Sequence, residues 1–155
     1  MCRISLNGAK KVHFIGIGGI SMSGLAEVLK RDGYTVTGSD DTASGITRHL
    51  NEIGIPVKVP TASENISGLD IDLVVYTAAI KADNPELSCA KAKGITVIER
   101  AALLGMMLKG YDHAVCVAGT HGKTTTTSMI SEVLLEAGLD PTISIGGHMG
   151  RDGTN

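Results

Sequence analysis

The residues best suited to chemistry lie in one short loop, Gly119-Thr-His-Gly-Lys-Thr-Thr125. An apolar run, 115–118, precedes it and an amphipathic segment follows, an order that predicts a strand, a phosphate-binding loop and a helix. Backbone N–H groups at a helix start are unpaired and carry partial positive charge, and glycines let the backbone approach a phosphate. Lys123 can reach the terminal phosphates of a nucleotide, and the Thr124 hydroxyl can ligate Mg²⁺.

This loop is shorter than the standard phosphate loop, G-x-x-x-x-G-K-[ST], whose first glycine would fall at Val117. Gly-Lys-Thr by itself is often only a helix start, so the flanking elements carry the prediction. His121 suits a phosphate contact and a solvated loop position about equally well. The predicted phosphate-binding residues are Gly119, Thr120, His121, Gly122, Lys123, Thr124 and Thr125.

A second glycine-rich stretch, 16–24, follows a first buried strand at 10–16. The helix after it should bury Met22, Leu25, Ala26 and Leu29. Gly16 and Gly18 fit the start of a dinucleotide fingerprint, but Ser21 stands where its third glycine belongs, and Asp40 follows the next strand where a ribose partner belongs. Two other interpretations stay open, namely glycines that only allow close helix packing and an Asp40 that caps a turn.

Further strands are predicted at 72–77 and 95–98, with an edge piece at 55–60. A helix over 99–109 is expected to turn Ala101, Leu104, Met107 and Leu108 inward. Ligands of open α/β sheets lie at the carboxyl ends of the strands. The candidate ligand-binding residues there are Gly16, Gly18, Gly19, Ser21, Ser39, Asp40, Thr77, Ala78 and Arg100. A tight turn at Thr77 and an ordinary surface salt bridge for Arg100 are the alternatives.

The expected fold class is therefore α/β. Residues 11–110 should form a Rossmann-like, doubly wound parallel sheet of about five strands. Residues 111–155 supply the start of a second, P-loop α/β domain: one strand–helix unit and a further strand at 142–145. The glycine-rich tail predicts a chain cut inside that domain. Its helix should bury Met129, Ile130, Val133, Leu134 and Ala137.

Composition narrows the class of protein. Hydrophobic residues make up 43% of the 155 residues and aromatics 3%, so the core is aliphatic. A net charge of −2 gives no field that would attract nucleic acid or a membrane surface. No apolar run approaches the roughly 18 residues of a membrane span, and the N-terminus does not resemble a signal peptide. The three cysteines suggest neither a disulfide framework nor a metal site, which favours a cytoplasmic location.

Three motifs now stand in one order: the glycine stretch 16–24, Tyr76-Thr-Ala-Ala-Ile80 with Asn84-Pro-Glu86, and the loop 119–125. Together they resemble the Mur ligase family, and within it the branch that adds the first amino acid of the peptidoglycan precursor. The similarity covers residues 10–155. Ser21 is a departure, because the family usually has glycine there.

The resemblance implies an ATP-dependent ligase that joins L-alanine to the lactyl carboxylate of UDP-N-acetylmuramate through an acyl phosphate. The first domain would bind the UDP-sugar with the nine residues at the sheet edge, and residues 119–125 would bind ATP. Lys123 and Thr124 would be catalytic, the lysine on the transferring phosphoryl group and Thr124 on Mg²⁺. The chain by itself is expected to bind the UDP-sugar without ligating. An NAD(P)-dependent oxidoreductase and a non-catalytic nucleotide-sugar-binding module remain as alternatives.

Overall fold

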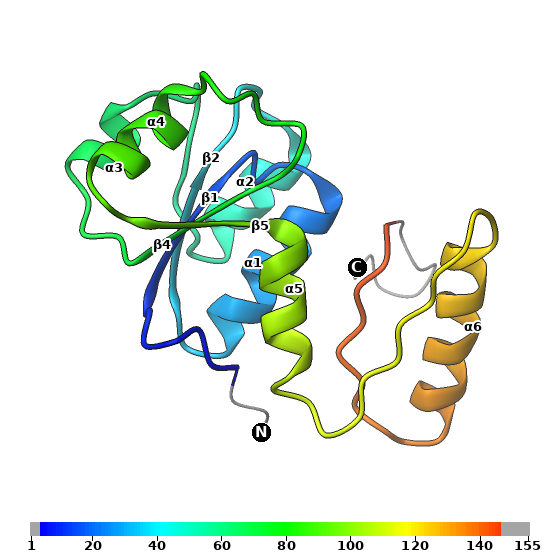
Figure 1. Ribbon diagram of the computed structural model, residues 1–155. Helices are drawn as coiled ribbons and strands as arrows, with labels where there is room; N and C mark the ends of the chain where they lie inside the picture. The colour runs from blue at the N-terminus through cyan, green and yellow to red at the C-terminus, as the bar shows by residue number, and fades with distance from the viewer. Residues whose placement is uncertain (1–3, 147–155) are drawn as a thin grey trace. The chain divides into compact units, whose positions relative to one another are not determined.

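The computed structural model describes residues 4–146. The chain divides into two compact units between Asp112 and His113 (Figure 1). The first unit alternates strands and helices throughout. Its strands are β1 (Lys11–Ile15), β2 (Thr35–Ser39), β3 (Val57–Lys58), β4 (Leu73–Tyr76) and β5 (Thr96–Glu99). Its helices are α1 (Ile20–Arg31), α2 (Gly45–Glu52), α3 (Glu64–Ser67), α4 (Pro85–Ala92) and α5 (Arg100–Leu108).

The strands form one parallel sheet in the order β3-β2-β1-β4-β5. Central β1 pairs with β2 on one side and β4 on the other, with His13 opposite both Thr37 and Val74. The chain therefore winds outward from β1 in both directions, which creates a switch point at the carboxyl ends of β1 and β4. The predicted doubly wound fold and its five strands are confirmed.

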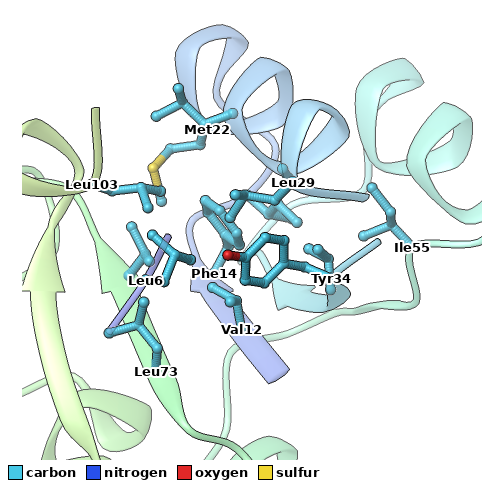
Figure 2. Packing of buried hydrophobic residues seen from close by; sticks show 14 of the residues in the cluster. Leu6, Val12, Phe14, Met22, Leu29, Tyr34, Ile55, Leu73 and Leu103 are labelled. Carbon is cyan, nitrogen blue, oxygen red and sulfur yellow. The ribbon is translucent and has the colours of Figure 1, made fainter. Parts of the chain in front are cut away.

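Alternate residues of β1 face opposite sides of the sheet, as a strand requires. Val12 and Phe14 join the larger apolar cluster, shown in Figure 2, which α1, α2 and α5 cover with Leu29, Leu50 and Leu103. Ile15 joins a smaller cluster under α3 and α4, whose other buried members are Ile66, Val74, Leu87 and Ala90. His13 faces this second side, where it meets α4.

Helix α1 buries the predicted residues Met22, Leu25, Ala26 and Leu29. The inward face predicted for α5 is confirmed at Met107, which is buried, and at Leu104, which is partly buried against the larger cluster. It is wrong at Ala101, which is exposed, and it missed Leu103, which is fully buried. Apolar residues surround almost the whole of α5, so its sequence period does not select a face. The helix begins immediately after β5, and packing under β4 and β5 sets its rotation.

The second unit, over its described residues 113–146, contains helix α6 (Lys123–Glu136) and no strand. The strands predicted at 115–118 and 142–145 are therefore not formed. A strand exists through hydrogen bonds to a neighbouring strand, and these segments make no such ladder. The inward face predicted for α6 is also wrong at Met129 and Val133, which are 65% and 68% exposed, and at Ala137, which is exposed too. A helix buries an apolar stripe only against another layer.

Candidate functional site

The loop between β1 and α1 lies at the carboxyl edge of the sheet, and the end of β2 holds it. The N–H groups of Gly16 and Ile17 both donate to the carbonyl of Ser39, at 2.9 and 3.0 Å. Gly16 has a φ of +76°, a left-handed conformation that glycine adopts without strain. The first glycine of the motif thus makes the tight turn that brings the chain from β1 to the start of α1.

Asp40 also holds this loop. Its Oδ2 accepts a 2.8 Å hydrogen bond from the Gly18 N–H, and its Oδ1 accepts one of 3.1 Å from the Thr42 N–H. A Cβ on Gly18 would lie 2.8 Å from that Oδ2, so a larger residue would push the carboxylate away from this position. Both carboxylate oxygens are engaged within the protein. Asp40 therefore shapes the glycine loop, and its predicted contact with a ligand stays a prediction.

Helix α1 begins at Ile20, with Gly19 as its N-cap. The Ser21 hydroxyl, in its first turn, accepts a hydrogen bond of 3.2 Å from Nη1 of Arg100. Arg100 is the first residue of α5 and follows β5 directly. The predicted residues Ser21 and Arg100, far apart in the sequence, are therefore brought together. A guanidinium stands beside a helix N-terminus, a combination that favours phosphate groups.

Thr77 and Ala78 follow β4 at the same edge. The Thr77 hydroxyl accepts from the Ala79 N–H at 3.3 Å, and the Thr77 carbonyl accepts from the Ile80 N–H at 3.0 Å. The turn folds Ile80 toward the glycine loop, where its Cδ1 lies 3.3 Å from the place of a Cβ on Gly16. The turn therefore packs the Ile80 side chain against the glycine loop.

Ser39 differs from the other candidates because it is completely buried. Its hydroxyl donates to Oε2 of Glu86, which is also fully buried. The Glu86 carboxylate accepts from Asn65 Nδ2 at 2.7 Å and from the Ala62 N–H at 3.2 Å, and His13 Nε2 lies 3.3 Å from its Oε2. We call Glu86 and its four partners the buried carboxylate network.

Sequence reasoning missed this network. Glu86 belonged to the Asn84-Pro-Glu86 motif, but no role followed from that motif. Asn84 caps α4, since its Oδ1 accepts from the N–H groups of Glu86 and Leu87, each at 3.0 Å. The polar His13 inside an apolar strand was the one available signal, and its side chain is buried, with 1% exposure. A buried imidazole needs partners on both nitrogens, and Nδ1 lies 2.8 Å from the Thr37 hydroxyl.

The network should make the first unit sensitive to acid. Burial by itself raises the pKa of the Glu86 carboxyl. Hydrogen bonds from His13, Ser39 and Asn65 outweigh that effect, so the pKa lies below its ordinary value. A lowered folded-state pKa stabilises the protein above the unfolded value of about 4.3 and stops doing so as the pH falls through the folded value.

We therefore expect the free energy of unfolding, measured with urea, to fall with decreasing pH below about pH 4.3. The fall should be steeper in the native chain than in Glu86→Gln, and the two slopes should differ by up to about 1.4 kcal/mol per pH unit. Asp72, whose pKa is lowered by the N–H groups of Lys10 and Lys11, titrates identically in both chains. Glu52→Gln, at an exposed site at the end of α2, serves as the control. Parallel acid slopes for the native chain and Glu86→Gln would contradict this.

The Gly-Lys-Thr loop leads into α6 in the second unit. Gly122 is the N-cap of α6 and has a φ of +78°, so the glycine permits the turn into the helix. Lys123 Nζ donates to the carbonyls of Gly119 and Thr120, at 2.7 and 3.2 Å. The lysine ammonium thus lies over the loop that should receive phosphate. The predicted residues Thr120, His121, Thr124 and Thr125 are all exposed around this helix start.

Two other features, a metal-binding cluster and a membrane-spanning helix, are not found in the part of the chain that the structure describes. Residues 4–146 contain no group of three or more His, Cys, Asp or Glu side chains that could hold a metal ion. None of their helices is long and apolar enough to cross a membrane.

The first unit belongs to the class of open parallel α/β domains, in which ligands bind at the carboxyl edge of the sheet and a helix N-terminus there suits a phosphate group. The model of the Mur ligase family, catalytic domain, matches residues 11–112. The chain belongs to the Mur ligase family. This membership does not favour the oxidoreductase alternative.

Individual relatives agree with the family. UDP-N-acetylmuramate–L-alanine ligases of Acetivibrio thermocellus and Lachnospira eligens are 58% and 54% identical over 149 and 155 residues. These alignments cover 96% and 100% of this chain and 31% and 34% of the relatives. The chain therefore spans about a third of the length of these relatives.

Solved structures show the same likeness. UDP-N-acetylmuramate-alanine ligase from Thermotoga maritima matches with a TM-score of 0.85 and 37% identity, over 93% of this chain and 34% of that one. The UDP-N-acetylmuramate:L-alanyl-gamma-D-glutamyl-meso-diaminopimelate ligase from Neisseria meningitides matches with a TM-score of 0.86 and 33% identity, over 94% and 45%.

Proposed function

We propose that this chain belongs to a cytoplasmic ligase that joins L-alanine to UDP-N-acetylmuramate at the expense of ATP. The first unit binds the UDP-sugar, and residues 119–125 bind ATP. The observation that carries the proposal is the Arg100 guanidinium held by Ser21 at the start of α1. That cation and the helix N-terminus suit the diphosphate of a nucleotide-sugar. The names of the relatives, which are 54–58% identical, supply the particular substrates.

Within the first unit we assign ligand contact to Gly18, Gly19, Ser21 and Arg100, and to the neighbouring turn at Thr77 and Ala78. Gly16, Ser39 and Asp40 hold the loop in shape: the Gly16 N–H binds the Ser39 carbonyl, the Ser39 hydroxyl binds Glu86, and the Asp40 carboxylate binds the N–H groups of Gly18 and Thr42. The other six residues are assigned to ligand contact because they lie at the start of α1, at the start of α5 or directly after β4. A diphosphate would approach the N–H groups of Ile20 and Ser21, the first two residues of α1, which have no acceptor within the helix.

Within the second unit, Lys123 and Thr124 would take the catalytic roles. The loop fits the phosphates of ATP because its glycines turn the backbone into a helix start and its lysine already lies over two carbonyls. Lys123 would exchange these carbonyls for phosphate oxygens and neutralise charge on the transferring phosphoryl group. The Thr124 hydroxyl would help to hold Mg²⁺, which supplies further neutralisation of that charge.

The reaction so proposed forms two bonds in turn. A carboxylate oxygen of the lactyl group takes the terminal phosphoryl group of ATP, which releases ADP. The amine of L-alanine then attacks the acyl phosphate, the amide bond forms, and inorganic phosphate leaves with the acyl–oxygen bond broken.

Calorimetric titration of the 155-residue chain tests the proposal. We expect saturable, one-to-one binding of UDP-N-acetylmuramate and no binding of NADH. Mg-ATP, as a parallel titrant, reports whether the loop at 119–125 binds nucleotide in this chain. Binding of NADH without binding of the UDP-sugar would overturn the ligase assignment and return the glycine loop to a dehydrogenase.

A further inference from the structure

The buried carboxylate network lies directly behind the glycine loop. Glu86 has no exposure to solvent, and it comes from α4, on the opposite face of the sheet from α1. A buried carboxylate is tolerated only when hydrogen bonds replace its water. Here the replacing groups come from β1, from β2, from the segment between β3 and α3, and from α3 itself. A well-packed apolar residue would fill this space without that cost, so the charge calls for an explanation.

The link to the loop runs through Ser39. Its hydroxyl donates to Glu86, and its carbonyl accepts from the N–H groups of Gly16 and Ile17. The next residue, Asp40, binds the Gly18 N–H. Ser39 therefore connects the buried carboxylate to two consecutive amides of the glycine loop, and its neighbour Asp40 binds the third.

We propose that Glu86 is a positioning residue for the ligand-binding loop: it fixes the carboxyl end of β2 and thereby the backbone at residues 16–18. This inference rests on the proposed function for the identity of the ligand. A carboxylate suits the task because it accepts several hydrogen bonds at once and so ties β1, β2, α4 and the 60–65 segment to one point. It acts from behind the loop and touches no ligand.

Amide hydrogen exchange in the ligand-free chain tests the positioning itself. In Glu86→Gln we expect the amides of residues 16–18 to exchange about tenfold faster, because one charge-assisted acceptor is replaced by a neutral amide with unwanted donors. The Tyr34 amide, bound to the Leu29 carbonyl at the far end of β2, gives the reference. If Glu86 only stabilised the fold, its replacement would accelerate amide exchange equally in the loop and at Tyr34, and that result would overturn the proposal.

Ser39→Ala keeps the test decisive if Glu86→Gln does not fold. This variant removes the connecting hydroxyl and leaves the other donors of the network in place. We expect the same selective acceleration at residues 16–18. Unchanged exchange there would refute the connection through Ser39. Glu52→Gln, which makes the same chemical change at an exposed position, should leave all of these rates as they are.

The binding experiment then separates this inference from the proposed function. With UDP-N-acetylmuramate as the probe, we expect Kd to rise about tenfold in Glu86→Gln and in Ser39→Ala, and to stay constant in Glu52→Gln. Should the native chain bind no UDP-sugar, the proposed function fails, and the exchange measurement still decides whether Glu86 positions the loop. An unaltered Kd together with a loosened loop would show that the loop does not contribute to binding, against the proposal.

Discussion

Replacement of Gly38 by alanine is expected to lower the free energy of unfolding of the first unit by about 3 kcal/mol. Gly38 lies in β2, and Ile17 crosses closely over it. A Cβ there would meet Ile17 Cδ1 at 2.5 Å, Ile17 Cβ at 2.9 Å and the carbonyl oxygen of Phe14 at 2.9 Å. Two of these atoms belong to or adjoin the backbone, so the clash cannot be relieved by a rotamer change alone. β1, the glycine loop or β2 must shift.

Gly105→Ala provides a matched control, because the same substitution should raise the free energy of unfolding there. Gly105 lies inside α5, it is exposed, and a Cβ there would have no neighbour within 4 Å. Alanine should therefore stabilise the unit by about 0.5–1 kcal/mol, because glycine loses more backbone entropy in a helix. Urea unfolding followed by circular dichroism measures both variants. Equal effects of the two substitutions would contradict the close approach at Gly38.

Strands and helices of the first unit could be predicted because each buries residues at its own period. The apolar run around Phe14 predicts a buried strand, and Met22, Leu25 and Leu29 recur at helical spacing. The structure confirms that all four side chains are buried. The strand ends then follow from topology, since parallel strands finish at one edge. The nine candidates lie along that edge for this reason. Which of them meets a ligand stays a prediction.

Contacts between distant residues could not be predicted in this way. His13 and Glu86 are separated by 73 positions, and no local pattern marks the pair. Asp40 fits a ribose partner by its place after β2, but the bond from the Gly18 N–H depends on how the loop turns back over that strand. The strand expected at 115–118 failed for a related reason: its existence depends on neighbouring strands, which the run itself does not contain.

The sharpest test of the proposed ligand is Arg100→Ala, which we expect to raise the Kd for UDP-N-acetylmuramate about 100-fold. A charge-assisted, forked contact to phosphate is worth about 1.5–3 kcal/mol, and about 2.7 kcal/mol corresponds to 100-fold. Calorimetry of the variant chain gives the value. Arg48→Ala, which removes the same charge from an exposed position of α2, should change Kd little, because exposed charges are screened by salt.

Two further variants separate the charge of Arg100 from its hydrogen bond to Ser21. Arg100→Lys keeps the charge but not the planar fork, so binding should recover only in part. Ser21→Ala removes the group that accepts from Nη1 at 3.2 Å while the guanidinium remains, so its loss should be the smaller one. If Ser21→Ala weakened binding as much as Arg100→Ala, the serine rather than the cation would be the main contact. If neither Ser21→Ala nor Arg100→Ala altered Kd, the diphosphate would not lie between α1 and α5, and the assignment of the sugar nucleotide to this edge would fail.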